Sequence, residues 1–301
     1  MHLLPAALPL RERLGEAFFR QVPRAPGVYL MRDRGDRVIY VGQSGNLRQR
    51  LGSYKNARLD RAPRKTIRLV HAVHSLTWEV CASPAAARLR EAQLLRVHRP
   101  PFNIVNPYPP ACRFISVGGE DPECVLQLGP EPVAGAAAYG AFKSGAGRAF
   151  GGLLRLLWTA AEPGRDWTSL PARLLAARPP AEFRFAPPAG RPARAWREAL
   201  QGFFGGTARE LLDWLEPAPA VNLFQQRFQE ADLELLRSFY QFGPRRLARL
   251  RREHAWTAEV VPPETLLDWL AEAGPLAEPP SETEGATFSP TLTPPAASPT
   301  P

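Results

Sequence analysis

Residues 27–42 read GVYLMRDRGDRVIYVG, and this stretch decides the fold of the first part of the chain. It contains two β-rich runs, Gly27–Arg32 and Arg37–Gly42, separated by four polar residues that are typical of a hairpin connection. If the end of the first run pairs with the start of the second, Tyr29 and Tyr40 lie directly opposite each other on one face. The stretch therefore predicts a hairpin that brings two phenols together, although cross-strand tyrosines are also common in sheets without an active site.

The segment after the hairpin predicts a helix that packs on the same sheet. Residues 44–54 place Leu47, Leu51 and Tyr54 on one helical stripe, and Arg50 stands at the edge of that stripe. We therefore expect the Arg50 side chain to point along the sheet rather than straight into water. A third strand is expected over residues 76–81.

A second helix carries one carboxylate on an apolar face. Ser83 is a typical N-cap for a helix that runs to about His98, and Glu91 shares one face of this helix with Ala87 and Leu94. A charge in such a stripe needs a partner. The sequence leaves two open, a nearby arginine or a divalent cation such as magnesium, which is well suited to one carboxylate with waters and a substrate phosphate.

The positive charge of the chain is concentrated in its first third. The 301 residues contain 38 Lys and Arg, of which only three are lysines, against 29 Asp and Glu. Residues 1–110 hold 19 of the cations and seven of the anions, a net charge of +12, which leaves −3 for the rest. The arginine bias alone is also what a GC-rich genome produces, but the asymmetry favours a polyanionic partner such as nucleic acid over a membrane surface or an acidic protein.

Composition also limits the class of protein. The hydrophobic share of 45% and the charged share of 22% suit a globular chain with two or three units, not a collagen-like or coiled-coil one. The three cysteines, Cys81, Cys112 and Cys124, show neither a disulfide framework nor the spacing of a zinc or iron–sulfur site. No apolar run of about 18 residues is present. We therefore expect a cytoplasmic protein with no membrane contact.

Proline-rich stretches and changes of pattern divide the chain into expected units. The first unit covers residues 1–110. A strand–helix unit is expected over 111–162, a linker over 163–192, a helical domain over 193–275, and a disordered Pro/Ser/Thr-rich tail over 276–301.

Five spaced elements of the first unit resemble the GIY-YIG nuclease domain of the UvrC family. They are Pro26-Gly-Val-Tyr29, Ile39-Tyr-Val-Gly42, Asn46-Leu-Arg-Gln-Arg-Leu51, Glu91 in a Leu-rich helix, and His98-Arg-Pro-Pro-Phe-Asn103. The resemblance implies an α+β domain around a three-stranded antiparallel sheet with flanking helices, which cuts double-stranded DNA with one Mg²⁺ or Mn²⁺ ion. The layout is closest to the short UvrC homologue Cho, which implies excision repair and incision 3′ to a lesion.

The resemblance also implies roles for particular residues. Tyr40 matches a tyrosine that deprotonates or positions the attacking water, and Tyr29 matches its partner. Arg50 matches the arginine that stabilises charge on the phosphate, Glu91 the metal ligand, and Asn103 the asparagine that closes the site. Either nearby cations lower the pKa of the tyrosine or the metal activates the water, and the sequence does not choose between them.

Other positions depart from the family pattern. Gln43 stands where UvrC proteins have a lysine, which predicts a loss of transition-state stabilisation and leaves a non-catalytic DNA-binding or scaffold module as the alternative function. Residues 222–240 resemble the hairpin that contacts UvrB only in part, so a UvrB-type partner and a self-packing hairpin both stay open. The stretch that corresponds to the family's cysteine group ends at Trp158 and holds no Cys, so no iron–sulfur cluster is implied.

Overall fold

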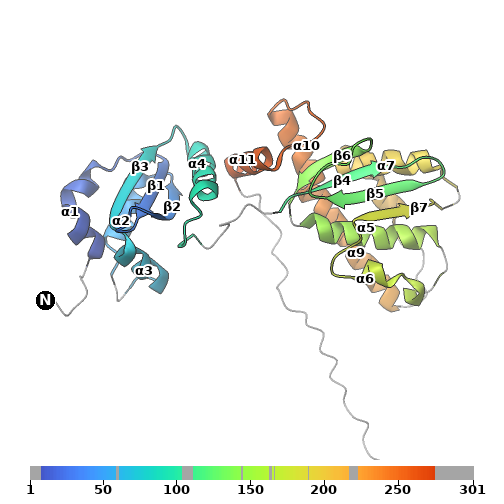
Figure 1. Cartoon of the computed structure of the whole chain (residues 1–301), viewed down its shortest axis with the longest axis horizontal. Coiled ribbons are helices and arrows are strands. Elements are labelled where there is room, and N and C mark those ends of the chain that lie inside the picture. Colours follow the sequence, from blue (N-terminus) through green and yellow to red (C-terminus); the bar gives the residue numbers. More distant parts are fainter. Residues whose placement is uncertain are drawn as a thin grey trace, which may run out of the picture.

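The computed structural model describes residues 8–58, 61–103, 111–143, 145–162, 165, 167–188, 190–216 and 223–274. These residues form two units that follow each other along the chain (Figure 1). The tail expected over 276–301 lies outside the described residues.

The first unit confirms the predicted α+β class with a three-stranded antiparallel sheet. The strand order is β2-β1-β3, so β1 is central and β2 forms one edge. Its elements are α1 (Pro9–Gln21), β1 (Gly27–Arg32), β2 (Val38–Ser44), α2 (Leu47–Lys55), α3 (Arg64–Ala72), β3 (Ser75–Val80) and α4 (Pro84–His98).

The hairpin register differs from the expected one by two residues. Tyr29 pairs with Gly42, and Met31 pairs with Tyr40, so the prediction that Tyr29 and Tyr40 are directly opposite is wrong. The cause is a register shift after Met31, together with a turn in which the Asp33 carboxylate accepts hydrogen bonds from backbone N–H groups. A shift of two keeps both tyrosines on the same face, because side chains alternate with a period of two.

Helices cover both faces of this sheet. The face that carries Tyr29 and Met31 packs against α1, α2 and α3, with Leu47 and Leu51 of α2 fully buried. The opposite face, which carries Val28 and Val41, packs against α4. N-caps explain where α2 and α4 begin: Asn46 accepts from the N–H of Gln49, and Ser83, the predicted cap, accepts from that of Ala86.

The second unit is built around a four-stranded antiparallel sheet of order β6-β4-β5-β7. In Figure 1, α7 lies above this sheet, and α5 with α9 lies below it. The strands are β4 (Arg113–Gly118), β5 (Cys124–Gly129), β6 (Ala137–Phe142) and β7 (Glu182–Phe185). The helices are α5 (Gly145–Ala161), α6 (Ala172–Leu175), α7 (Ala193–Gly205), α8 (Glu210–Trp214), α9 (Leu223–Phe242), α10 (Pro244–Glu253) and α11 (Pro263–Ala273), with a short 3₁₀ turn, η1 (Trp167–Ser169).

This second unit corrects the expected division of the chain. The segment 163–192 is not only a linker, because β7 pairs with β5 and buries Phe183 and Phe185. One apolar core runs from Cys112 to Trp269, so residues 111–162 and the helical region pack together instead of forming separate units.

A buried ion pair joins the two long helices of this core. Arg155 of α5 donates to both carboxylate oxygens of Asp232 of α9, at 2.7 and 2.5 Å, and Asp232 is 4% exposed. The face of α9 that holds Asp232 therefore closes the core of its own unit. Phe224, at the start of α9, is 70% exposed.

Helix α11, the last in the described segments, contacts the first unit. Arg88 of α4 donates to the carbonyl oxygens of Ala271 and Glu272 at the C-terminus of α11, and Arg96 pairs with Asp268. Figure 1 shows α11 between α4 and the second sheet. Among the helices of the described segments, none is long and apolar enough to cross a bilayer.

Candidate active site

Three tyrosines and one arginine meet on the α2 face of the first sheet. The Arg50 guanidinium donates through Nε to the Tyr29 hydroxyl and through Nη2 to the Tyr54 hydroxyl, each at 3.2 Å. The Tyr54 hydroxyl lies 3.3 Å from that of Tyr29 and 3.5 Å from that of Tyr40. The ring centroids of Tyr29 and Tyr40 are 6.1 Å apart, as expected for diagonal neighbours on adjacent strands. We call these four residues the tyrosine cluster.

Two glycines allow close approaches around the first sheet. A Cβ at Gly42 would lie 2.4 Å from the Tyr29 hydroxyl oxygen and 2.5 Å from the ring carbon that bears it. A Cβ at Gly27 would lie 2.3 Å from the carbonyl oxygen of Glu79 and 2.7 Å from a methyl carbon of Leu47. Each glycine therefore makes room for a close approach, the first of them to the cluster itself.

The three tyrosines differ in their access to solvent. Tyr29 is fully buried and Tyr54 is 7% exposed, whereas Tyr40 is only partly buried. Burial raises the pKa of Tyr29, and the neighbouring Tyr54 and Tyr40 add to this effect. Burial also raises the pKa of Tyr40 to about 12, with a further contribution from its hydrogen bond with Tyr54. Tyr40 is thus the most accessible of the three tyrosines, and it is a neutral phenol at pH 7.

Arg50 keeps its charge inside this cluster. Burial by itself lowers the pKa of Arg50. The hydrogen bond with Tyr29 and the three nearby phenols together outweigh this effect, so the pKa of Arg50 is raised overall. A cation that also donates two hydrogen bonds to fixed hydroxyl groups is well oriented, so its remaining N–H groups can bind a phosphate oxygen.

The other three predicted residues, Asn103, Gln43 and Glu91, lie at the outer edge of β2, the edge that does not pair with β1. Asn103 accepts a hydrogen bond from the N–H of Val41 at 2.9 Å and donates one to its carbonyl oxygen at 2.7 Å. The N–H of Phe102 donates to the carbonyl oxygen of Ile39, so residues 102 and 103 line this edge. Two residues after Val41 in the same strand, the backbone of Gln43 hydrogen-bonds to the Glu91 carboxylate. Asn103 and Glu91 therefore border the strand that carries Tyr40.

Glu91 fits a cation ligand. Burial raises its pKa, while the hydrogen bond from Gln43 and the charge of Arg50 act in the opposite direction. Among the described residues none forms an ion pair with Glu91, and Arg50 acts on this carboxylate through its charge without a direct contact. A partly desolvated carboxylate without an ion-pair contact suits Mg²⁺, which takes oxygen ligands and keeps several waters. Within the same described segments, no group of three or more His, Cys, Asp and Glu side chains could hold a metal ion, so Glu91 would be the main protein ligand.

The structure thus brings Tyr29, Tyr40 and Arg50 together and places Glu91 and Asn103 along the adjoining edge. Gln43 enters the site through its backbone. The sequence interpretation missed Tyr54, which it assigned to the apolar stripe of the helix. Its position four residues after Arg50 was the available signal, because residues at this spacing are neighbours on a helix.

Comparisons with known proteins identify the first unit. The family model for the UvrC-like GIY-YIG domain matches residues 25–104. UvrABC system protein C of Acaryochloris marina is 40% identical over 95 residues, which are 32% of this chain and 15% of that protein. The same protein of Bdellovibrio bacteriovorus is 39% identical over 85 residues, 28% of this chain and 13% of that protein. Residues 25–104 therefore form a UvrC-like GIY-YIG domain, a nuclease family, and the chain spans about one seventh of the length of these curated relatives.

A solved domain is similar to part of this chain. It is the GIY-YIG N-terminal endonuclease domain of UvrC from Thermotoga maritima, bound to its catalytic divalent cation, magnesium. The two are 30% identical over a match that covers 29% of this chain and 91% of the solved domain, with a TM-score of 0.26.

Proposed function

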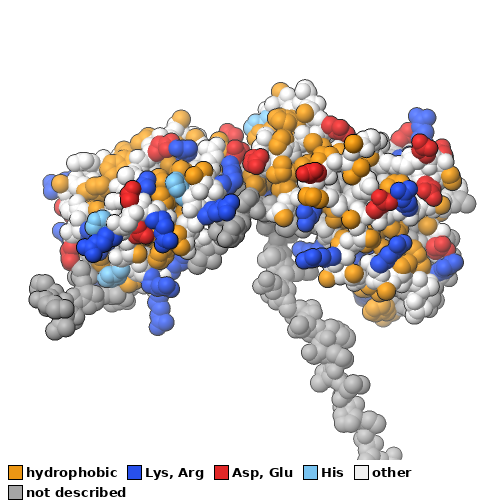
Figure 2. Space-filling view, in the orientation of Figure 1, with side chains coloured by type: hydrophobic (Ala, Val, Ile, Leu, Met, Phe, Trp, Pro, Cys, Tyr) orange, Lys and Arg blue, Asp and Glu red, His pale blue; other side chains and the backbone are white. Residues whose placement is uncertain are grey.

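We propose that this chain, whose residues 25–104 form a UvrC-like GIY-YIG domain, is a metal-dependent endonuclease that hydrolyses phosphodiester bonds of double-stranded DNA. The observation that carries the proposal is the tyrosine cluster: Arg50 is held by two hydroxyl groups beside the accessible Tyr40, and an unpaired carboxylate, Glu91, lies within its electrostatic reach. The net charge of +12 over residues 1–110 supports a polyanionic substrate. On the face drawn in Figure 2, several Lys and Arg side chains are spread over the first unit.

The side chains of the cluster would act on the phosphate and on the attacking water. Hydrolysis of a phosphodiester adds negative charge to the phosphoryl oxygens, and the Arg50 guanidinium is positioned to stabilise that charge. Tyr40, a neutral phenol at pH 7, can orient a water molecule through its hydroxyl oxygen. It can take the proton of that water only if a nearby cation lowers its pKa.

Glu91 would hold the divalent cation, Mg²⁺ or Mn²⁺. When bound there, such an ion supplies Lewis-acid stabilisation of charge on the phosphate and lowers the pKa of nearby acidic groups. Asn103 has a positioning role in this proposal, because it fixes the main chain of Val41, between Tyr40 and Gly42.

We further propose a role in nucleotide excision repair, with incision 3′ to a lesion as in the short homologue Cho and a UvrB-type protein as the partner that delivers the substrate. The similarity to UvrABC system protein C and the layout of the chain support this role.

Nicking of plasmid and of lesion-bearing duplex with Mg²⁺ or Mn²⁺ tests the activity. Tyr40→Phe and Glu91→Gln should each abolish most of the nicking. Tyr139→Phe and Glu79→Gln are matched controls outside the site and should retain it. Equal nicking by all four variants would exclude the tyrosine cluster and Glu91 as the site.

Binding of Mg²⁺ separates the nuclease from the alternative, a DNA-binding or scaffold module that keeps the fold. Calorimetry on the wild type with a non-cleavable duplex should show one site that Glu91→Gln removes. Tight binding of the duplex without a metal site in either protein would instead support the scaffold function, which the glutamine at position 43 favours.

A further inference from the structure

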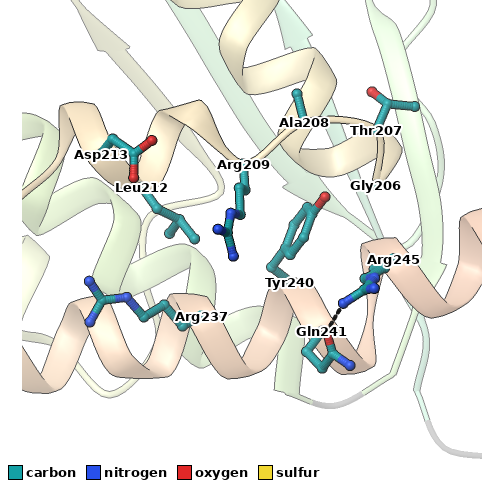
Figure 3. A pocket seen from close by; sticks show the side chains of 10 residues that line it. All are labelled: Gly206, Thr207, Ala208, Arg209, Leu212, Asp213, Arg237, Tyr240, Gln241 and Arg245. Carbon is teal, nitrogen blue, oxygen red and sulfur yellow. Dashed lines mark hydrogen bonds between the residues drawn. The ribbon is translucent and has the colours of Figure 1, made fainter.

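A second basic surface lies far from the tyrosine cluster, between α8, α9 and α10 of the second unit. A cavity of about 680 Å³ is open there between the end of α7 and the α9–α10 corner. Figure 3 shows Arg209 and Tyr240 projecting into the space between the two chain segments, with Arg237 and Arg245 on its lower side. Ten residues line it: Gly206, Thr207, Ala208, Arg209, Leu212, Asp213, Arg237, Tyr240, Gln241 and Arg245.

This cavity continues into a smaller hollow along α10. The hollow is lined by Gln241, Arg245, Arg246, Arg249 and Arg252, so the two share Gln241 and Arg245. Residues 244–253 contain five arginines and one glutamate, a net charge of +4, whereas residues 111–301 as a whole carry −3. The arginine surface, as we call the lining of the two hollows, is therefore a local excess of positive charge.

Several of these arginines have no acidic partner. Arg209, Arg245 and Arg252 are exposed and form no ion pair with any residue in the described segments; Arg245 donates only to the Gln241 side chain, at 2.8 Å. Asp213 is the one acidic residue among the described residues that line the two hollows. Other acidic groups lie at their border: Glu216 lies 3.4 Å from Arg237, Glu253 lies 3.4 Å from Arg249, and Glu230 and Glu234 line a neighbouring hollow along α9. The Arg237–Glu216 and Arg249–Glu253 ion pairs are exposed and contribute little stability, so a ligand that binds these arginines loses little by breaking them.

The arrangement fits a row of phosphates better than a single small anion. Arg245, Arg249 and Arg252 recur at intervals of four and three residues, so they follow one stripe of α10 over roughly 10 Å. Arg209 extends the row across the cavity. A compact phosphate needs arginines that converge on one point, whereas these side chains are spread along a line, as contacts to a nucleic-acid backbone are.

Hydroxyl groups in the cavity suit the same ligand. The Tyr240 ring packs against Phe203, with centroids 5.2 Å apart, and Figure 3 shows its hydroxyl directed into the cavity towards the Gly206–Ala208 segment. Thr207 lines the cavity close by. Tyrosine and threonine hydroxyls are common donors to phosphate oxygens in protein–DNA complexes.

From these observations we propose that the arginine surface is a second DNA-binding site, which binds the sugar–phosphate backbone of duplex DNA outside the nuclease domain. In Figure 1, α10 lies at the end of the second unit that faces the first unit, beside α11, which contacts α4. A duplex bound at the nuclease site could thus be held by both units. This inference rests on the proposed DNA substrate and extends it to a second contact.

The test is the salt dependence of duplex binding without divalent cations, so that no cleavage occurs. The affinity of wild type for a short fluorescent duplex is compared with that of a patch variant, Arg209→Gln/Arg245→Gln/Arg252→Gln. We expect the slope of log K against log salt to decrease by about 3 in magnitude, about one for each phosphate contact removed. All three side chains are exposed, and thermal unfolding should show an unchanged Tm.

The matched control is Arg184→Gln/Arg194→Gln/Arg227→Gln, which removes the same charge from exposed arginines elsewhere in the second unit. It should leave the slope unchanged. An unchanged slope in the patch variant, or an equal decrease in both triple variants, would overturn the inference. Calorimetry with inorganic phosphate tests whether the arginine surface binds a small anion instead of DNA. If the patch variant loses phosphate binding while its duplex slope equals that of wild type, the second DNA-binding site is also overturned.

These outcomes are separable from failure of the nuclease proposal. If the slope decreases as expected but wild type nicks no DNA with Mg²⁺, the arginine surface stands and the nuclease function fails. If wild type binds no duplex at all, both proposals fail.

Discussion

Replacing Gly42 with alanine should damage the site through a single methyl group. The added Cβ would lie 2.4 Å from the Tyr29 hydroxyl oxygen, and ordinary contact begins near 3.4 Å, so the phenol must retreat by about 1 Å. It has no free space for this movement, because Tyr29 is fully buried and its hydroxyl is held at 3.2 Å by Arg50 and at 3.3 Å by Tyr54.

The size of the effect follows from that displacement. Inserting a carbon into a well-packed core costs about 1–3 kcal/mol of unfolding free energy. In a domain of 60–100 residues, each kcal/mol lowers Tm by about 4–8 °C. Since Arg50 and Tyr54 move with the hydroxyl they contact, we expect Gly42→Ala to lower the rate of nicking by about 100-fold, which is typical of a misplacement of 1 Å.

Single-turnover nicking measures the loss of activity in Gly42→Ala, and thermal unfolding measures its loss of stability. Gly52→Ala is the matched control, because a Cβ there meets nothing within 4 Å and Gly52 lies inside α2. It should stabilise the protein by roughly 0.5–1 kcal/mol and leave nicking unchanged. A Gly42→Ala variant with the Tm and the nicking rate of wild type would refute the argument that this glycine exists to admit the Tyr29 hydroxyl.

Four further predictions follow from the same site. Arg50→Gln removes the charge and both hydrogen bonds to the tyrosine hydroxyls, so single-turnover nicking should fall by about 10²- to 10³-fold. Glu91→Gln should abolish Mg²⁺ binding in calorimetry and raise Tm in EDTA at pH 7. Burial raises the pKa of Glu91, so the protonated side chain contributes fully to stability below the ordinary value of 4.5, and this contribution is lost as pH rises through the folded pKa. At pH 7 the neutral glutamine avoids that loss. Because the Tyr40 pKa is raised from 10.0 to about 12, the unfolding free energy should decrease between these pH values, and urea titrations should show a smaller decrease for Tyr40→Phe. Gln43→Lys should increase the nicking rate by about tenfold or more, measured under the same single-turnover conditions.

The candidate site was largely predictable because its residues lie on regular elements. Alternation along two strands placed Tyr29 and Tyr40 on one face, and this survived an error of two in the register, since only an odd shift moves a side chain to the other face. The helical spacing around Leu47 and Leu51 likewise placed Arg50 at the sheet. Local periodicity was sufficient for these positions.

Features that depend on tertiary contacts were not predictable in this way. Tyr54 fits an apolar stripe equally well, and only the position of the strand tyrosines makes its hydroxyl part of the cluster. Residues 182–185 give too short a pattern to indicate a strand, and β7 forms because the edge of β5 offers backbone partners and a core for Phe183 and Phe185. The sequence interpretation also did not anticipate that the last helix would contact α4.

The contact between α4 and α11 has a consequence for the order in which the chain assembles. The hydrogen bond from Arg88 to the carbonyl oxygen of Glu272 joins residues that are 184 positions apart. Closing a loop of that length has to wait until the whole second unit has been made, while every strand of the first sheet is available from the first hundred residues. During synthesis the tyrosine cluster can therefore form early, and the helix that carries Glu91 stays uncovered on the side that meets α11 until α11 has left the ribosome.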